Sequence, residues 1–274
     1  MPGSELYEKF MALHTRDGGL VMPNAWDGLS ALMLADAGFE AIATSSAAIA
    51  ATLGRLDRRH EVTREEHLEH ARLLGRLTGL PVNGDFEDGY GDMPEDVAAT
   101  VEAAVESGLA GIGVEDTSGD PDQPIRDFDE AVHRVRSAVD AAKGRIVVTG
   151  RTDNFIQGRP DLDDTIRRLT AFAEAGADVV YAPFPPDREA LVAIVTAVAP
   201  TPVNVLVSPS DKVLTVAELQ HAGVKRISLG PLLYTHAMGA LEQATKALRA
   251  GDLASATTGM SFARVNEVLA RGMN

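Results

Sequence analysis

Eight short runs of β-branched and aliphatic residues alternate with longer amphipathic segments, and this alternation limits the possible fold more than any other feature. The predicted strands cover residues 20–22, 41–44, 82–85, 111–114, 146–149, 179–181, 203–206 and 226–229. Several of the intervening predicted helices end at a glycine directly before the next strand. Repeated strand-then-helix units predict an α/β fold with parallel strands.

A (β/α)₈ TIM-type barrel and a doubly wound open sheet both contain such units. An open sheet gathers its functional residues at one switch point, whereas polar residues follow nearly all eight predicted strands here. We therefore expect the α/β class and a single (β/α)₈ barrel domain over residues 1–274. Residues from about 231 to 274 follow the eighth strand and are predicted to form a C-terminal helical extension.

Two of the predicted helices begin with a capping-box pattern. Thr63 and Glu66 form such a pair at the start of the helix predicted over residues 63–77. Asp127 and Glu130 form the same pair at the start of the helix predicted over residues 127–142. In such a box each side chain accepts a hydrogen bond from the backbone N–H of the other residue. The sequence therefore predicts both helix starts.

Polar residues stand at the carboxyl ends of most predicted strands. They are Asn24, Thr44, Ser45, Ser46, Asp85, Glu87, Glu115, Asp116, Arg151, Asp153, Asn204, Ser208, Tyr234 and His236. In a barrel these ends meet at one mouth, so residues far apart in the chain can contact one ligand. Any one of them could cap a helix or lie in a loop, but acids, an arginine and paired serines together favour a functional site.

The segment Asp-Phe-Glu-Asp-Gly-Tyr-Gly, residues 85–91, carries the clearest chemical signal. Asp85 and Glu87 lie where the third strand gives way to a loop, and glycines 89 and 91 allow that loop to turn tightly. Mg²⁺ commonly takes only one or two protein carboxylates and keeps several waters. The segment therefore predicts a divalent-metal site, with an acidic surface turn as the alternative.

Charge and composition exclude several classes of protein. The net charge of −15 opposes binding to nucleic acid or to anionic membranes, and a small anionic substrate would need a locally basic pocket. The sequence has no run of 18 apolar residues and no cationic leader pattern, so we expect a cytoplasmic protein. The absence of cysteine excludes disulfides and thiolate chemistry.

Four motifs in combination resemble the isocitrate lyase and phosphoenolpyruvate mutase superfamily, over about residues 21–238. They are the serine turn at 45–46, the segment 85–91, Val114-Glu115-Asp116, and Gly150-Arg151-Thr152-Asp153. The resemblance implies a (β/α)₈ barrel, usually in a tetramer whose neighbours exchange the final helix. We therefore expect a homo-oligomer, either a dimer or a tetramer.

The same resemblance implies the roles of individual residues. It implies Mg²⁺ or Mn²⁺ at Asp85, Glu87 as a second ligand or a water-bridged partner, and Glu115 holding coordinated water. The expected substrate is a small 2-oxo carboxylic acid. Its expected binding residues are Ser45, Ser46, the backbone of Ala47, Arg151 and Asn204.

The sequence also departs from the family pattern. Family lyases carry a Lys-x-Cys-Gly-His-type segment after strand four and mutases a lysine and an asparagine, but residues 116–126 contain none of these. His236 stands where the tricarboxylate lyases have an arginine, which favours an acid of two to five carbons. His236 is the candidate catalytic acid because its reference pKa lies near neutrality, and a helix-surface histidine is the alternative.

These features predict a carbon–carbon lyase that acts through a metal-stabilised enolate, most simply an oxaloacetate-decarboxylase-like enzyme. The alternatives are an isocitrate or 2-methylisocitrate lyase-like enzyme, or a phosphonate C–P enzyme with an altered loop. A catalytically weak protein that only binds a 2-oxo acid is the alternative of a different class. Residues 116–126 are expected to form an exposed, mobile gate without an apolar face.

Overall fold

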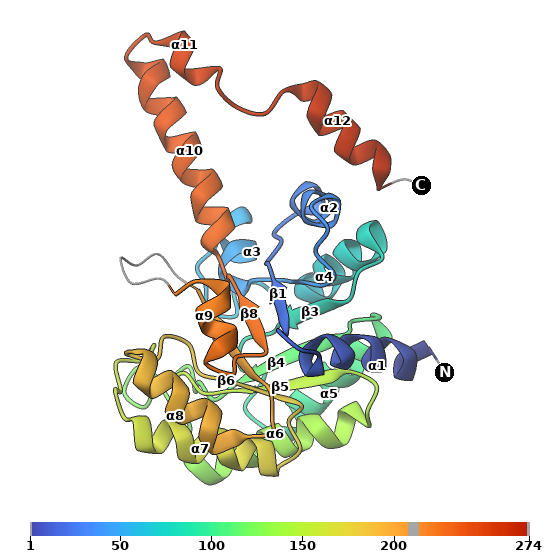
Figure 1. The fold of residues 1–274 in the computed structure, drawn as a ribbon, viewed down its shortest axis with the longest axis vertical. Helices are drawn as coiled ribbons and strands as arrows, with labels where there is room; N and C mark the ends of the chain where they lie inside the picture. Colours follow the sequence, from blue (N-terminus) through green and yellow to red (C-terminus); the bar gives the residue numbers. More distant parts are fainter. Residues whose placement is uncertain (1, 208–213, 273–274) are drawn as a thin grey trace.

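A computed structural model describes residues 2–207 and 214–272; Ser208 lies outside them. Eight parallel strands form one sheet in the order β1-β8-β7-β6-β5-β4-β3-β2, so each strand from β2 to β7 pairs with the next in sequence and β8 pairs with β1 (Figure 1). They are β1 (Leu20–Met22), β2 (Ile42–Ala43), β3 (Val82–Asp85), β4 (Gly111–Glu115), β5 (Val147–Arg151), β6 (Val179–Tyr181), β7 (Val203–Leu206) and β8 (Arg226–Ser228). The predicted (β/α)₈ barrel is confirmed.

The barrel closes between β1 and β2 through a bridge of Asn24 to Ala43. The Asn24 side chain strengthens this junction, because its Nδ2 donates to the Thr44 carbonyl at 2.6 Å. Its Oδ1 accepts from the backbone N–H groups of Leu229, at 3.0 Å, and Gly230, at 2.8 Å. One buried amide thus joins the ends of β1, β2 and β8.

Helices cover the outside of the barrel between successive strands (Figure 1). They are α2 (Gly28–Asp36), α3 (Ser46–Thr52), α4 (Arg64–Thr78), α5 (Pro94–Glu106), α6 (Phe128–Ala142), α7 (Leu162–Glu174), α8 (Arg188–Val198) and α9 (Val216–His221). Helix α1 (Pro2–Thr15) precedes the first strand. Within residues 2–207 and 214–272, no helix has both the length and the apolar character to cross a bilayer.

One of the two predicted capping boxes is present. Thr63 begins α4, its hydroxyl accepts from the Glu66 N–H at 3.2 Å, and the Glu66 carboxylate accepts from the Thr63 N–H at 2.8 Å. The box predicted at Asp127 is wrong, although α6 does begin there, because Glu130 pairs instead with Arg126 at 2.6 Å. An ion pair between residues four apart in the sequence therefore takes the place of the cap.

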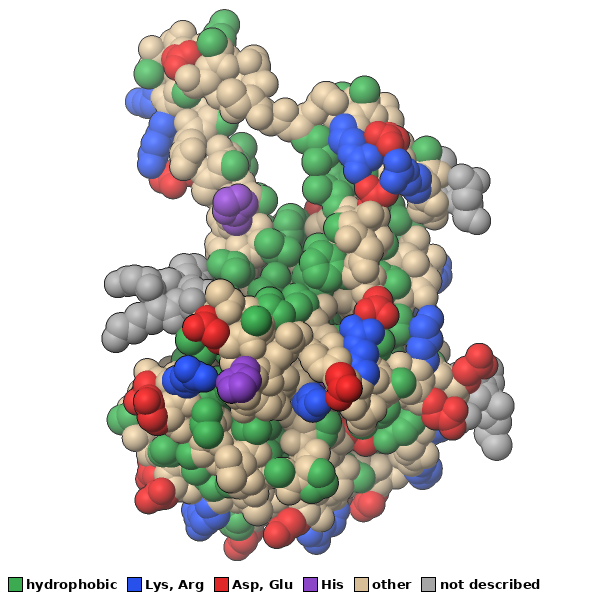
Figure 2. All heavy atoms as spheres, in the orientation of Figure 1, with side chains coloured by type: hydrophobic (Ala, Val, Ile, Leu, Met, Phe, Trp, Pro, Cys, Tyr) green, Lys and Arg blue, Asp and Glu red, His purple; other side chains and the backbone are tan. Residues whose placement is uncertain are grey.

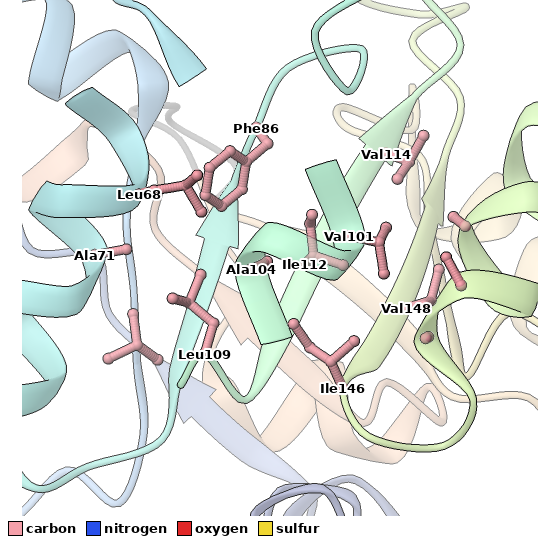
Figure 3. Close-up of a cluster of buried hydrophobic side chains, with 14 of the residues drawn as sticks. Leu68, Ala71, Phe86, Val101, Ala104, Leu109, Ile112, Val114, Ile146 and Val148 are labelled. Carbon is pink, nitrogen blue, oxygen red and sulfur yellow. The ribbon is translucent and has the colours of Figure 1, made fainter. Parts of the chain in front are cut away.

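The largest hydrophobic cluster lies between the outer face of β3–β5 and helices α4–α6 (Figure 3). Ile112 and Val148 point outward into it and meet Val101 and Ala104 of α5. Burying each large aliphatic side chain contributes about 1.5–3 kcal/mol. This cluster lies outside the strands, whereas the residues of β3–β5 that line the cavity on the other side, among them Gly113 and Thr149, are small or polar.

The chain beyond β8 forms an arm of α10 (Leu232–Arg249), α11 (Leu253–Ala256) and α12 (Phe262–Arg271). Helix α10 leaves the barrel, and α12 returns to pack on α2, where Arg264 and Arg271 pair with Asp36 (Figure 1). No residue of α10, all of which the structure describes, is buried. Exchange of this arm with a second chain stays a prediction.

Candidate active site

A cavity of ≈ 220 Å³ opens at the carboxyl ends of the strands. Its lining includes seven of the nine site residues predicted from the sequence, namely Ser45, Ser46, Ala47, Asp85, Glu115, Arg151 and Asn204. The other two, Glu87 and His236, lie elsewhere. Barrel closure therefore brings together residues from positions 45 to 204.

Asp85 is held in one orientation at the end of β3. Its Oδ2 accepts from the backbone N–H of Ser46 at 2.9 Å and from the Ser46 hydroxyl at 3.0 Å. Its backbone N–H donates to the Thr44 hydroxyl at 2.8 Å, and its carbonyl lies 3.1 Å from His67 Nδ1. The carboxylate is thus positioned before any ligand binds.

The two serines of the turn after β2 have different roles. Ser45 begins α3 as its N-cap, and its hydroxyl accepts from the Ala48 N–H at 3.4 Å. Ser46 holds Asp85, and Ala47 lines the cavity beside it. Carboxylate binding by Ser45, Ser46 and Ala47 stays a prediction.

Asp57, in the loop between α3 and α4, was missed by the sequence analysis. It lines the same cavity, and its Oδ1 is buried without a hydrogen-bond partner among the described residues. Burial raises the pKa of Asp57, and the negative charge of Asp85 raises it further. In the sequence Asp57 stands directly before Arg58 and Arg59, and such a run of charged residues is typical of an exposed loop. Its position in the loop after strand two was the only signal that it belongs to the site.

Asp85 and Asp57 together fit a hard divalent cation. Over the described part of the chain, no group of three His, Cys, Asp or Glu side chains lies close enough to bind a metal. Mg²⁺ does not need such a group, because one or two carboxylates and several waters complete its shell. The unpartnered Asp57 oxygen and the fixed Asp85 carboxylate provide that number.

Glu87 lies in a neighbouring cavity of ≈ 460 Å³, which shares Arg58 and Glu115 with the first. Its backbone has a φ of +52°, and its Oε2 lies 3.7 Å from His60 Nε2. Burial raises the pKa of Glu87 to about 7, although His60 opposes the rise. Glu87 therefore lines a different cavity from Asp85, and its role as a second ligand or a water-bridged partner stays a prediction.

The loop after Asp85 is braced from α6. Arg134, buried at 1% exposure, donates at 2.7 Å to the carbonyls of Asp88, Gly91 and Asp92. Gly91 has a φ of +148°, and a Cβ there would lie 2.4 Å from Asp96. The predicted tight turn therefore needs this glycine.

Arg151 is already paired with two carboxylates. Its Nη1 lies 2.6 Å from Glu115 and its Nε 2.6 Å from Asp153, while the guanidinium stacks 5.1 Å above the Tyr181 ring. Burial raises the pKa of Glu115, and the Arg151 charge opposes that rise. The guanidinium is thus a fixed charge beside the cavity, and its two-pronged edge faces Asp153.

Arg226, which the sequence analysis also missed, orients Asn204 from the floor of the cavity. Its Nε donates to Asn204 Oδ1 at 2.9 Å, and its Nη2 donates to Thr149 at 3.0 Å. Asn204 therefore presents its NH₂ group, which donates to Ser228 at 3.0 Å. Arg226 has no carboxylate partner in the described structure, and burial lowers its pKa to about 10.

His236 is exposed on α10, and the described lining of either cavity does not include it. The predicted role of His236 as the catalytic acid stays a prediction.

The loop after β4 also differs from expectation. Ile125 is buried at 2% exposure and forms a bridge with Thr117, so the prediction that the loop lacks an apolar contact is wrong. Asp116 pairs with Arg168 at 3.3 Å, and Arg126 pairs with Asp88 at 3.1 Å. Only residues 119–123 are exposed, and their mobility stays a prediction.

Comparison with known families supports the motif pattern. Residues 10–249 match the family model described as phosphoenolpyruvate phosphomutase. The chain belongs to this family. The predicted membership of the isocitrate lyase and phosphoenolpyruvate mutase superfamily is thereby confirmed.

Three similar proteins illustrate the range of the family. The oxaloacetate decarboxylase of Paraburkholderia xenovorans is 32% identical over 250 residues, which are 87% of this chain and 80% of the relative. A solved structure from Burkholderia cenocepacia J2315 is 41% identical, with a TM-score of 0.91 and coverage of 97% and 96%. Oxaloacetate acetylhydrolase, solved with its product oxalate, is 28% identical, with a TM-score of 0.85 and coverage of 97% and 94%.

Proposed function

We propose that this family member is a Mg²⁺- or Mn²⁺-dependent enzyme that cleaves a C–C bond of a small 2-oxo acid through an enolate. Decarboxylation of an oxaloacetate-type acid is the first candidate. The observation that carries the proposal is the fixed Asp85 carboxylate beside the unpartnered Asp57 oxygen in one cavity. At ≈ 220 Å³ this cavity suits an acid of few carbons. A cytoplasmic homo-oligomer belongs to the same proposal.

A divalent ion supplies Lewis-acid stabilisation of the negative charge that develops on the keto oxygen. The chain's own residues provide orientation and further electrostatic stabilisation. Arg151 contributes a positive charge held by two carboxylates, and Asn204 offers an N–H donor fixed by Arg226. Such groups need no reorganisation when the substrate reacts, which is why preorganised donors stabilise a transition state effectively.

The related proteins support the choice of substrate. An oxaloacetate decarboxylase and an oxaloacetate acetylhydrolase both match most of the chain, and both names specify oxaloacetate. Decarboxylation of such an acid needs a stabilised enolate and later protonation by water. It therefore tolerates a chain without cysteine.

The test is turnover by purified protein with Mg²⁺ or Mn²⁺ on a panel of small 2-oxo acids. We expect release of pyruvate from oxaloacetate faster than in a metal-only control, and loss of the excess rate with a chelator. A rise in melting temperature without turnover of any acid would instead indicate the binding-protein alternative. Cleavage of a 2-methylisocitrate-type or phosphonate substrate alone would replace the decarboxylase assignment.

A further inference from the structure

Arg58 is the cation of the cavity that has the fewest protein partners. It lies in the loop between α3 and α4, directly after Asp57, and lines both cavities. Its side chain is 38% exposed, its Nη2 lies 3.3 Å from Asp153, and its Nε lies 3.9 Å from Asp57 Oδ2. A guanidinium carries five N–H donors, so most of them remain available to a ligand.

The other two arginines of the cavity are committed to the protein. Arg151 lies 2.6 Å from each of two carboxylates, and Arg226 donates to Asn204 and Thr149. Arg151 and Arg226 are 13% and 2% exposed, whereas Arg58 is 38% exposed. A substrate carboxylate that enters the cavity therefore meets Arg58 as its most available partner.

The backbone holds Arg58 in an unusual conformation. Its φ is +61°, in the left-handed region that non-glycine residues rarely adopt, and His60 has a φ of +49°. Glu61 stabilises the turn, because its carbonyl accepts from Arg55 and its carboxylate from the Leu56 N–H, both at 2.9 Å. The turn places Asp57 and Arg58 on the same cavity.

We propose that Arg58 binds the second, remote carboxylate of a 2-oxo dicarboxylic acid and makes the site selective for dicarboxylic over monocarboxylic oxo acids. This inference rests on the proposed function and names the substrate class of the same site. Planar, paired donors suit a carboxylate better than a single ammonium group would.

The test compares two five-carbon acids, 2-oxoglutarate and 2-oxopentanoate, which differ by a terminal carboxylate in place of a methyl group. Calorimetry with Mg²⁺ present measures their dissociation constants for the wild type, Arg58→Gln and the matched control Arg59→Gln. We expect the wild type and the control to prefer 2-oxoglutarate by at least tenfold. Arg58→Gln should lose this preference and bind 2-oxopentanoate as the wild type does.

Arg58→Asn serves as a second variant, because asparagine tolerates the left-handed backbone better than most residues. Retention of the preference in a folded Arg58 variant, or its loss in Arg59→Gln, would overturn the inference. Equal binding of both acids by the wild type would also overturn it and leave the turnover test of the proposed function intact. Selective binding without cleavage of any acid would refute the proposed reaction alone, and failure of both acids to bind would refute both proposals.

Separate measurement of KM and kcat gives an independent test if oxaloacetate is the substrate. Decarboxylation breaks the bond between C3 and the remote carboxylate, whose carbon leaves as CO₂ while the electron pair forms the enolate. Arg58 contacts the carboxylate of the ground state, so Arg58→Gln should raise KM at least tenfold and leave kcat unchanged or higher. A fall in kcat with KM unchanged would contradict the inference.

Discussion

Asp85 and Asn204 each have a polar neighbour that sets their orientation before a ligand arrives. Ser46 donates two hydrogen bonds to Asp85, and Arg226 donates one to the amide oxygen of Asn204. Productive geometry in a site depends on such supporting contacts, because a small displacement of a reacting group costs much of the rate. The supporting residues should therefore matter as much as the groups that contact the ligand.

We expect Asp85→Asn to abolish metal-dependent binding of oxo acids and turnover, because the amide removes the negative charge that the metal needs. The Asn side chain can still accept from Ser46, so the fold should remain. Titration with Mn²⁺ measures metal binding by the variant, and thermal unfolding shows whether the fold remains. A variant that keeps full metal-dependent turnover would refute the site assignment.

We expect Gly113→Val to block ligand binding without unfolding the protein. Gly113 lines the cavity, and the nearest atom to an added Cβ is the Gly84 carbonyl at 3.9 Å, so the side chain enters empty space. Gly111→Val is the contrasting variant, because a Cβ there would lie 2.4 Å from Asn83 and should disrupt packing. Equal thermal unfolding of the two variants would contradict this distinction.

His14 should make stability depend on pH. Burial and the Arg226 charge lower the pKa of His14 to about 3, although the Phe10 carbonyl opposes them. The unfolded chain therefore takes up the proton first as pH falls below about 6.5, and the folded state loses stability through the window down to about 3. Between pH 7 and 5 this loss is about 2 kcal/mol. Denaturant unfolding at pH 7 and pH 5 measures this loss of stability. The loss should be absent in His14→Gln and should remain in the control His221→Gln, which changes an exposed residue.

At the level of secondary-structure elements, the barrel depends on contacts at its junction. Between β1 and β2 the bridge at Asn24 replaces a regular ladder, and the Asn24 amide supplies three hydrogen bonds to neighbouring strand ends. Arg134 plays a similar part for the loop after β3, where it binds three carbonyls. Single buried side chains therefore determine the geometry at the mouth.

We expect Asn24→Ala to lower the free energy of unfolding by about 2–4 kcal/mol, because buried backbone groups lose their partners. Asn83→Ala is the matched control, since Asn83 Oδ1 is buried without a partner among the described residues and its Nδ2 reaches only the Gly84 carbonyl, at 3.4 Å. Chemical denaturation of both variants gives the comparison. A loss at position 24 no larger than that at position 83 would contradict the role of Asn24 in closure.

At the level of the whole molecule, the arm is the feature that a single chain leaves most exposed. Leu253, Met260 and Phe262 are 68%, 50% and 76% exposed. Figure 2 shows hydrophobic side chains around the opening between the arm and the barrel. Exposed apolar residues gathered in one region favour an interface, and a second copy of the chain is the expected partner.

We expect sedimentation to give a mass above the 29.0 kDa of one chain. The double variant Leu253→Ser and Phe262→Ser should shift the distribution toward the monomer, because it removes the apolar contact area that an interface would bury. Val192→Ser, a 40% exposed position on α8, should leave the distribution unchanged. A monomeric wild type would refute the oligomer prediction.

The sequence by itself determined the barrel and most of the mouth. Strand and helix periodicity are local properties, and parallel strands that follow one another bring all their carboxyl ends to one side. Asp85, Arg151 and Asn204 could therefore be placed together from their positions alone. The Thr63 cap was equally predictable, because both partners lie within four residues.

Only the tertiary structure decided which polar groups meet. Asp57 and Arg58 reach the cavity from a loop whose path depends on left-handed residues, and Arg226 finds Asn204 only after β7 and β8 pair. Glu87 and His236 are not in the described lining of the cavity that Asp85 lines, and their predicted roles stay predictions. Side-chain partners depend on contacts across the closed barrel, and local sequence patterns do not encode those contacts.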